Sequence, residues 1–243
     1  MGEFEGGESE FAQQNPLYKA GTVETMRIVR DGTRFRTDGL EPRTGWELEV
    51  DMRAQALAEA GAEMIAGLAS YVSGDHVVAV DNETFDWGYW NMQMRRSSTK
   101  LMEFWERTAD WEDWQLGVER TLTYWRDQRE VCAQSGLVFA PPLASRLIVH
   151  TREALTGGRF DAIRYGDKPP MSGWWFTGPD WDHDTSKITI RHGYHVAAEH
   201  PELAKYLGLA PGSWFRPGPP EEFGFEAEWA SQQSGDSGGP PPA

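Results

Sequence analysis

The sequence has almost no cysteine and no long apolar run. Cys132 is the single cysteine among 243 residues, so the chain cannot form an internal disulfide, which fits a reducing compartment. No apolar run approaches the roughly 20 residues of a membrane-spanning helix. The first residues, MGEFEGGESEF, have neither the basic nor the apolar region of a secretory signal. We therefore expect a cytoplasmic protein that does not bind a membrane.

Basic residues are missing from both ends of the chain. The first eighteen and the last twenty-three residues contain nine acidic residues and no lysine or arginine. The whole chain has a formal net charge of −15 at pH 7. Nucleic acid and anionic lipid would both repel a chain of this charge. The charge balance therefore argues against a nucleic-acid partner and favours a basic protein.

The motifs of common catalytic classes are also absent. The sequence contains no HExxH zinc motif, no GxSxG nucleophile motif and no phosphate-binding P-loop. His183, His192 and His195 are ligand-type residues, but their spacing matches no familiar metal site. Cys132 falls on an apolar stripe, where a cysteine is usually inert packing. We expect a protein that is not an enzyme and needs no cofactor or metal.

Composition divides the chain into four segments. Residues 1–20 and 218–243 are rich in glycine, acidic residues and, at the carboxyl end, proline, which predicts disorder. The paired prolines of 140–142 cannot continue a helix and indicate a domain boundary. We expect two α+β domains, at residues 21–139 and 140–217.

The first domain is predicted to contain strands followed by a helical pair. A hairpin turning at Asp31-Gly32 precedes a strand at 45–50 and a helix from Met52 to Val72. Short strands are expected at 76–80 and 86–94. Residues 98–134 are expected to form two helices, because apolar residues recur there at helical spacing. The two stripes are Leu101, Trp105, Thr108 and Trp111, and then Val118, Leu122, Trp125 and Cys132.

The second domain is predicted to alternate short strands with short helices. Strands are expected at 146–150, 160–165, 173–177 and 187–190. Thr151 should cap a short helix that ends at the glycines 157–158. A longer helix is expected over 196–209, with Pro201 in a first turn.

From about residue 145 to 216, the order of these motifs resembles a family of small bacterial domains known as immunity protein 33. The resemblance rests on LIVHTREALTGG, RYGDKPP, SGWWFTG, the acidic loop PDWDHD and the closing PELAKYLGLAPGSWF. One position departs from the family pattern, because Met171 stands where an acidic residue is expected before Ser172. The first 140 residues resemble no family that we recognise.

The resemblance implies an immunity protein that binds a toxin made by the same or a neighbouring cell and blocks it. We expect the chain to occlude the active site of its cognate toxin. If that toxin is a nuclease it will be basic, and the acidic residues here would imitate phosphate. The sequence does not indicate an oligomeric state.

Two stretches combine aromatic and acidic residues and are the candidate partner-binding sites. The first lies in the PDWDHD loop and the second in EFWERTADWEDW. Aromatic anchors flanked by carboxylates suit a basic protein surface. Trp174 and Trp175 are adjacent, so in a strand they should face opposite sides. The candidate residues are Asp180, Trp181, Asp182 and Asp184 in the first stretch, and Glu106, Asp110, Glu112 and Asp113 in the second.

Two alternatives belong to other functional classes. A metal-dependent hydrolase or small-ligand enzyme would use aromatic walls and the three histidines in a pocket between the two domains. An adaptor protein would use its acidic ends as interaction segments.

Overall fold

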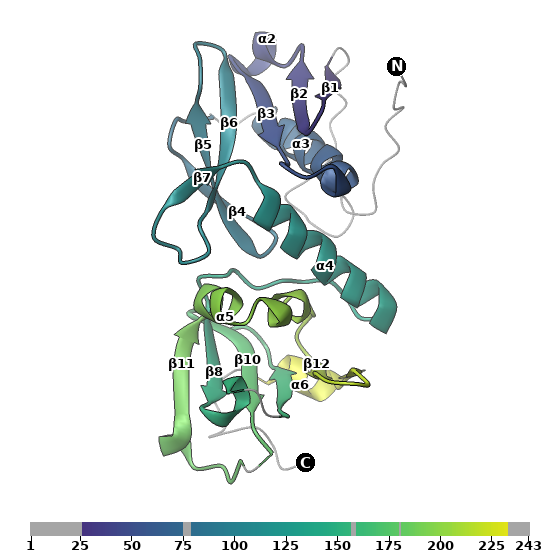
Figure 1. The fold of residues 1–243 in the computed structure, drawn as a ribbon, viewed down its shortest axis with the longest axis vertical. Coiled ribbons are helices and arrows are strands. Elements are labelled where there is room, and N and C mark those ends of the chain that lie inside the picture. Colours follow the sequence, from purple (N-terminus) through teal and green to yellow (C-terminus); the bar gives the residue numbers. More distant parts are fainter. Residues whose placement is uncertain (1–25, 75–78, 157–158, 180, 233–243) are drawn as a thin grey trace. The chain divides into compact units, whose positions relative to one another are not determined.

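The computed structural model describes residues 26–74, 79–156, 159–179 and 181–232 and has an α+β fold (Figure 1). The fold class predicted from the sequence is confirmed. The predicted disordered segment 1–20 lies outside the described residues. Within these ranges, no helix is long and apolar enough to span a membrane.

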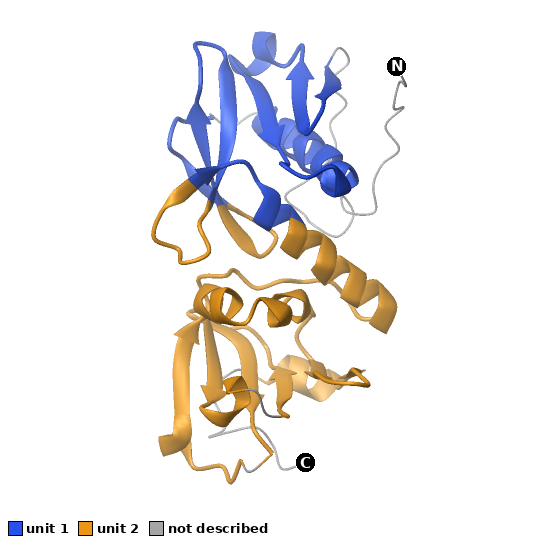
Figure 2. Cartoon of the chain, in the orientation of Figure 1, with its two compact units in different colours: residues 1–85, 92–106, 115–122 blue, residues 86–91, 107–114, 123–243 orange. Residues whose placement is uncertain are grey.

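The chain divides into two compact units (Figure 2). Unit 1 consists of residues 1–85, 92–106 and 115–122, and unit 2 of residues 86–91, 107–114 and 123–243. Two short segments, 86–91 and 107–114, therefore belong to unit 2, and from residue 123 onward the whole chain belongs to it. The boundary expected between residues 139 and 140 comes later in the chain than this last crossing.

A seven-stranded mixed sheet begins in unit 1, with the order β1-β2-β3-β6-β5-β4 and β7 beside β6. The pairs β1–β2, β2–β3 and β5–β6 are antiparallel, whereas β3 and β6 run parallel. Its strands are β1 (Arg27–Asp31), β2 (Arg34–Asp38), β3 (Glu47–Asp51), β4 (Thr84–Trp87), β5 (Trp90–Arg96), β6 (Leu101–Arg107) and β7 (Trp114–Leu116). The helical segments of this part are α2 (Glu41–Thr44), η1 (Gln55–Leu57) and α3 (Ala58–Val72).

Helix α3 packs against β2 and β3 and closes the core of unit 1. The strand β3 alternates between buried and half-buried residues, with Leu48 and Val50 fully buried. Met64 and Ile65 of α3 are buried as well, as the periodicity of the sequence predicts. The opposite face of β1–β3 carries charged side chains, as is usual for an antiparallel sheet with one solvated face.

The predicted first hairpin is present, but its turn lies one residue later than expected. Asp31 pairs with Arg34, which leaves Gly32 and Thr33 as the loop. Gly32 has a positive φ of 59°, at the first central position where a two-residue turn accepts glycine. The strand expected at 86–94 is a hairpin formed by β4 and β5. Part of the strand expected at 76–80 lies outside the described residues, and Ala79 and Val80 are in no strand.

The predicted helical pair at 98–134 is wrong in its first half. Leu101 to Arg107 form strand β6, and only α4 (Glu119–Ser135) is helical. A spacing of four residues, such as that from Leu101 to Trp105, also keeps side chains on one face of a strand. The alternating burial of β6, with Met102, Phe104 and Glu106 inside, is typical of a strand.

Unit 2 contains a six-stranded sheet with the order β11-β8-β10-β9-β12-β13. Only β8 and β10 run parallel. The strands are β8 (Leu147–Thr151), β9 (Asp161–Arg164), β10 (Met171–Thr177), β11 (Ile188–His192), β12 (Ser213–Arg216) and β13 (Glu222–Phe225). The helical segments that follow α4 are η2 (Glu153–Leu155), η3 (Thr185–Lys187), α5 (Gly193–Glu199), η4 (Pro201–Tyr206) and α6 (Ala227–Ser231).

Three local expectations in unit 2 need correction. Thr151 ends β8 instead of capping a helix, and the expected helix is the single 3-10 turn η2. The helix expected over 196–209 is broken at His200, because a residue before proline avoids helical backbone angles. The tail expected to be disordered from residue 218 contains β13 and α6, held by the apolar side chains of Phe223 and Trp229.

Trp174 and Trp175 face opposite sides of β10, as predicted. Trp174 is fully buried in the larger core, where it contacts Phe176 and Phe215. Trp175 lies in a smaller cluster on the other face, which includes Val149 and Tyr165 and is flanked by Trp229 of α6. The two tryptophans are therefore core residues of unit 2.

Candidate partner-binding surfaces

The first candidate surface is the loop between β10 and η3, residues 178–184. Gly178 donates its backbone N–H to Thr151 Oγ1 at 3.0 Å, and Trp181 donates its backbone N–H to the carbonyl oxygen of Gly178 at 3.1 Å. The ring of Trp181 is half-buried and its centroid lies 5.9 Å from that of His183. The predicted site residue Asp180 lies outside the described residues. The loop thus presents one partly exposed tryptophan beside its acidic residues.

The carboxylates of Asp182 and Asp184 are exposed but engaged within the loop. Asp182 forms an ion pair with Lys187 at 2.5 Å, and Asp184 accepts the N–H of Ser186 at 3.0 Å at the start of η3. The hydrogen bond from Lys187 lowers the pKa of Asp182, and the bonds from Ser186 lower the pKa of Asp184. Both groups therefore stay ionised at neutral pH, while Lys187 offsets part of the negative charge.

The second candidate surface is the loop 108–113 between β6 and β7. Asp110, Glu112 and Asp113 are exposed there, and no lysine or arginine lies among the six residues. Asp110 accepts a hydrogen bond from Thr108 Oγ1 at 2.5 Å, and Asp113 accepts the N–H of Trp114 at 2.7 Å. These contacts order the loop and leave its acidic side chains at the surface.

Glu106 was predicted as a partner-binding residue, but its side chain is inside unit 1. The residue is 1% exposed, and its carboxylate accepts four hydrogen bonds. The donors are Thr121 N–H and Oγ1, Arg120 N–H and Gln115 Nε2, at 2.7 to 3.0 Å. Two of these donors are N–H groups in the first turn of α4, where the helix itself offers them no acceptor. Glu106 therefore fixes the start of α4 and is not available to a partner.

Trp111 of loop 108–113 belongs to a stack of aromatic rings. Trp111 stacks on Tyr194 with ring centroids 4.3 Å apart and planes 9° apart. Tyr194 also stacks on His192 at 5.0 Å, and Trp90 and Trp111 form a T-shaped pair with ring centroids 4.8 Å apart. Trp111 has a positive φ of 64°, a costly conformation for a large side chain, which these contacts compensate. Sequence reasoning missed Tyr194, since Trp111 was expected in a helix.

The three histidines of the hydrolase alternative do not form one cluster. His183 precedes β11, whereas His192 ends it and His195 lies in α5. A strand of five residues spans about 16 Å, so His183 is separated from the other two. In the described ranges, no group of three or more His, Cys, Asp or Glu side chains is arranged to hold a metal ion. Cys132 is buried, which raises the pKa of its thiol to about 11.

The same geometry separates the two acidic loops. Loop 178–184 leads into β11 through η3, and Tyr194, which contacts Trp111, follows the other end of β11. The two loops therefore lie toward opposite ends of this strand. They are two distinct surfaces of unit 2 and can be tested separately.

The Ser-Gly-Trp element has a structural role around Arg164. This arginine is 1% exposed, donates from Nε to the carbonyl of Ser172 at 3.2 Å, and pairs with Asp167 at 3.0 Å. Ser172 Oγ donates to the carbonyl of Leu147 at 2.8 Å. Gly173 has a positive φ of 83°, and an added Cβ would lie 2.2 Å from the carbonyl oxygen of Tyr165. The motif thus joins β8, β9 and β10.

Met171, which replaces the expected acidic residue, packs against the smaller cluster of Trp175. Its side chain therefore lies on the opposite face from the larger core. An acidic residue could not make this apolar contact, and the ionic partner of Arg164 is Asp167.

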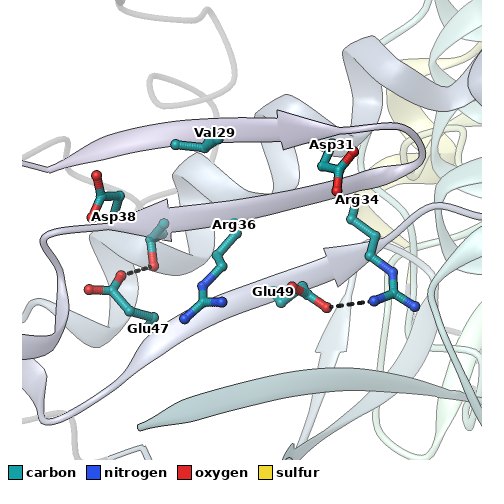
Figure 3. A pocket seen from close by; sticks show the side chains of 8 residues that line it. Val29, Asp31, Arg34, Arg36, Asp38, Glu47 and Glu49 are labelled. Carbon is teal, nitrogen blue, oxygen red and sulfur yellow. Dashed lines mark hydrogen bonds and ion pairs between the residues drawn. The ribbon is translucent and has the colours of Figure 1, made fainter.

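Unit 1 has a shallow hollow of about 370 Å³ on its open sheet face (Figure 3). It is lined by Val29, Asp31, Arg34, Arg36, Thr37, Asp38, Glu47 and Glu49. Arg34 pairs with Glu49 at 3.4 Å, and Glu47 accepts a hydrogen bond from Thr37 at 2.6 Å. Glu47 also accepts backbone N–H groups at the start of α2. Glu47 and Glu49 thus bond to neighbouring segments of unit 1.

The comparisons with known proteins assign a family to part of unit 2. Residues 127–221 match the model of the Imm33-like domain, and the rest of the chain is unassigned. No curated protein and no solved structure matches the chain. The match covers the whole α4-to-β12 region except the first turns of α4, and it contains the Ser-Gly-Trp element and loop 178–184.

Proposed function

Because residues 127–221 form an Imm33-like domain, we propose that this chain is an immunity protein that binds a cognate bacterial toxin and neutralises it. The domain match is the observation that carries the proposal. The chain acts without chemistry, by covering the active site of the toxin. It needs no cofactor and works in the cytoplasm of the producing cell.

The contact with the toxin is centred on loop 178–184. This loop lies inside the Imm33-like match, and it offers Trp181 beside two ionised carboxylates, Asp182 and Asp184. A half-exposed tryptophan can fill a pocket of a partner, and carboxylates steer a basic surface toward it. Asp180 is included in this proposed contact from the sequence. A basic toxin, such as a nuclease, suits this charge.

Loop 108–113 is the second proposed contact. It lies outside the Imm33-like match and carries three exposed acidic residues, Asp110, Glu112 and Asp113. The stack of Trp111 on Tyr194 fixes this loop to α5.

The proposal is tested by recovering the toxin from the cells that produce the chain. The full chain is used as bait at low and at high salt. We expect one basic protein that is released as the salt rises and that inhibits growth when expressed alone. Co-expression of the chain must then restore growth. A recovered protein whose toxicity the chain does not relieve would contradict the proposal.

The two loops are then compared by matched charge reversals in the recovered complex. Asp182→Lys with Asp184→Lys changes the first loop, and Asp110→Lys with Glu112→Lys makes the same change of charge in the second. We expect the first pair to weaken binding by about a hundredfold, mostly through electrostatic steering and lost rim contacts. An unchanged affinity for the first pair would exclude loop 178–184 as the contact.

A further inference from the structure

The outer edge of β1 is open in the part of the chain that the structure describes. Within those residues β1 pairs with β2 alone and ends the seven-stranded sheet. All five of its residues are exposed, including Ile28 at 36% and Val29 at 50%. An edge strand presents a row of unpaired N–H and C=O groups, which can pair with another strand. Among the placed residues no further strand pairs with this edge, and it carries exposed apolar side chains.

The hairpin geometry determines which backbone groups point outward. A two-residue loop is closed by a hydrogen-bonded pair, here Asp31 and Arg34. Because the pattern alternates, the N–H and C=O groups of Asp31, Val29 and Arg27 face β2. Those of Ile28 and Arg30 therefore face away from β2.

We propose that this edge binds a second copy of the chain through antiparallel pairing of β1 with β1, centred on Val29. In this register Ile28 lies opposite Arg30 of the second copy, and Arg30 lies opposite Ile28 of the second copy. Both residues present outward backbone groups, so the two pairs form four hydrogen bonds. The interface is isologous and closes as a two-fold dimer.

The side chains of β1 are self-complementary in this register. Arg27 of each copy lies opposite Asp31 of the other copy, and the two Val29 side chains meet at the centre. Neither Arg27 nor Asp31 has a side-chain hydrogen bond or ion pair among the described residues. Figure 3 places Val29 and Asp31 on the same side of β1 as the charged residues of β2. Charges on an edge usually prevent pairing, whereas these form two ion pairs.

The dimer is expected to be weak, because a five-residue strand buries much less than a standard interface. We expect a dissociation constant on the order of 10–100 µM for a contact of this size. Sedimentation equilibrium of the full chain should show a mass that rises with concentration from 27.4 kDa toward twice that value.

Two single charge reversals test the register. Arg27→Asp would place a carboxylate opposite Asp31 of the other copy at both ends of the interface. Asp31→Arg would likewise place a guanidinium opposite Arg27 at both ends. Each variant alone should dimerise at least about tenfold more weakly.

An equimolar mixture of the two variants restores both opposite-charge pairs and should dimerise like the wild-type chain. This rescue cannot come from a repaired folding defect, because each variant is unchanged in the mixture.

A wild-type chain that stays monomeric over the whole concentration range would overturn the proposal. If the Arg27 and Asp31 variants then lose toxin binding, the edge of β1 binds the toxin. If removal of residues 1–25 creates a dimer, that segment binds the edge of β1. A dimer that neither variant weakens, or a mixture without rescue, would also overturn it.

Discussion

Glu106 is an acidic residue whose role depends on burial and not on charge pattern. In the surrounding sequence, EFWERTADWEDW, one acidic residue points into the core and others point outward. Composition alone does not distinguish the buried residue from the exposed ones. Burial raises the pKa of Glu106, although hydrogen bonds from Thr121, Arg120 and Gln115 act in the opposite direction. The carboxylate satisfies buried donors at the start of α4.

We predict that Glu106→Gln destabilises the chain by about 2 kcal/mol, since the amide NH₂ would face N–H donors of α4. The free energy of unfolding in urea measures this. Glu103→Gln is the matched control on the same strand, where the side chain is half-exposed, and it should cost less than about 0.5 kcal/mol. Equal effects of the two substitutions would contradict the assigned role of Glu106.

His150 gives a pH-dependent prediction. The residue is 6% exposed and its Nε2 has no hydrogen-bond partner in the described ranges. Burial lowers the pKa of His150 below its ordinary value of 6.5; Arg191 and His200 lower it further, whereas the Thr151 carbonyl and Glu199 raise it. The unfolded chain therefore binds a proton more readily than the folded chain.

The stability that His150 contributes is present above pH 6.5 and is lost as the pH falls through the lower, folded-state pKa. We expect the wild-type chain to lose more thermal stability between pH 7.5 and pH 5 than His150→Phe, which keeps a ring of similar size. Thermal melts at both pH values measure the difference. Parallel losses in the two proteins would show that His150 does not titrate in this way.

At the scale of elements, the sequence predicted strands better than turns and short helices. The strands β8 to β11 follow the expected order, because their apolar runs are bounded by glycine, proline or polar residues. Strands β6 and β7 were missed, since the spacing of four residues in β6 fits a strand and a helix equally well. The stack of Trp111 on Tyr194 joins residues far apart in the chain, and no local pattern encodes it.

Strand β10 contains an irregularity between Met171 and Trp175, and Gly173 lies within it. We predict that Gly173→Ala destabilises unit 2 by about 3 kcal/mol, because the new Cβ would overlap the carbonyl of Tyr165 and alanine disfavours a positive φ. Gly136→Ala is the matched control, with a φ of 69° and no atom within 4 Å of the new Cβ, and should cost about 1 kcal/mol. Urea unfolding compares them, and equal losses would contradict the close approach at Gly173.

At the scale of the whole molecule, the Imm33-like domain accounts for residues 127–221, and unit 1 has no family assignment. The sequence predicted this domain from the order of its motifs. It did not predict that the Ser-Gly-Trp element surrounds a buried arginine, because Arg164 and its partners come from several strands and loops. Composition identified the acidic residues of loop 178–184. Their contacts with Lys187 and Ser186 could be seen only in the structure.

We propose that the chain neutralises its toxin by binding and not by catalysis. The most direct measurement is a titration of the purified toxin with the full chain, with toxin activity as the readout. We predict that activity falls linearly and ends at one chain per toxin. It should return in full when high salt separates the complex. Complete inactivation of the toxin by a small fraction of an equivalent of the chain, with no recovery after separation, would contradict inhibition by binding and indicate an enzyme.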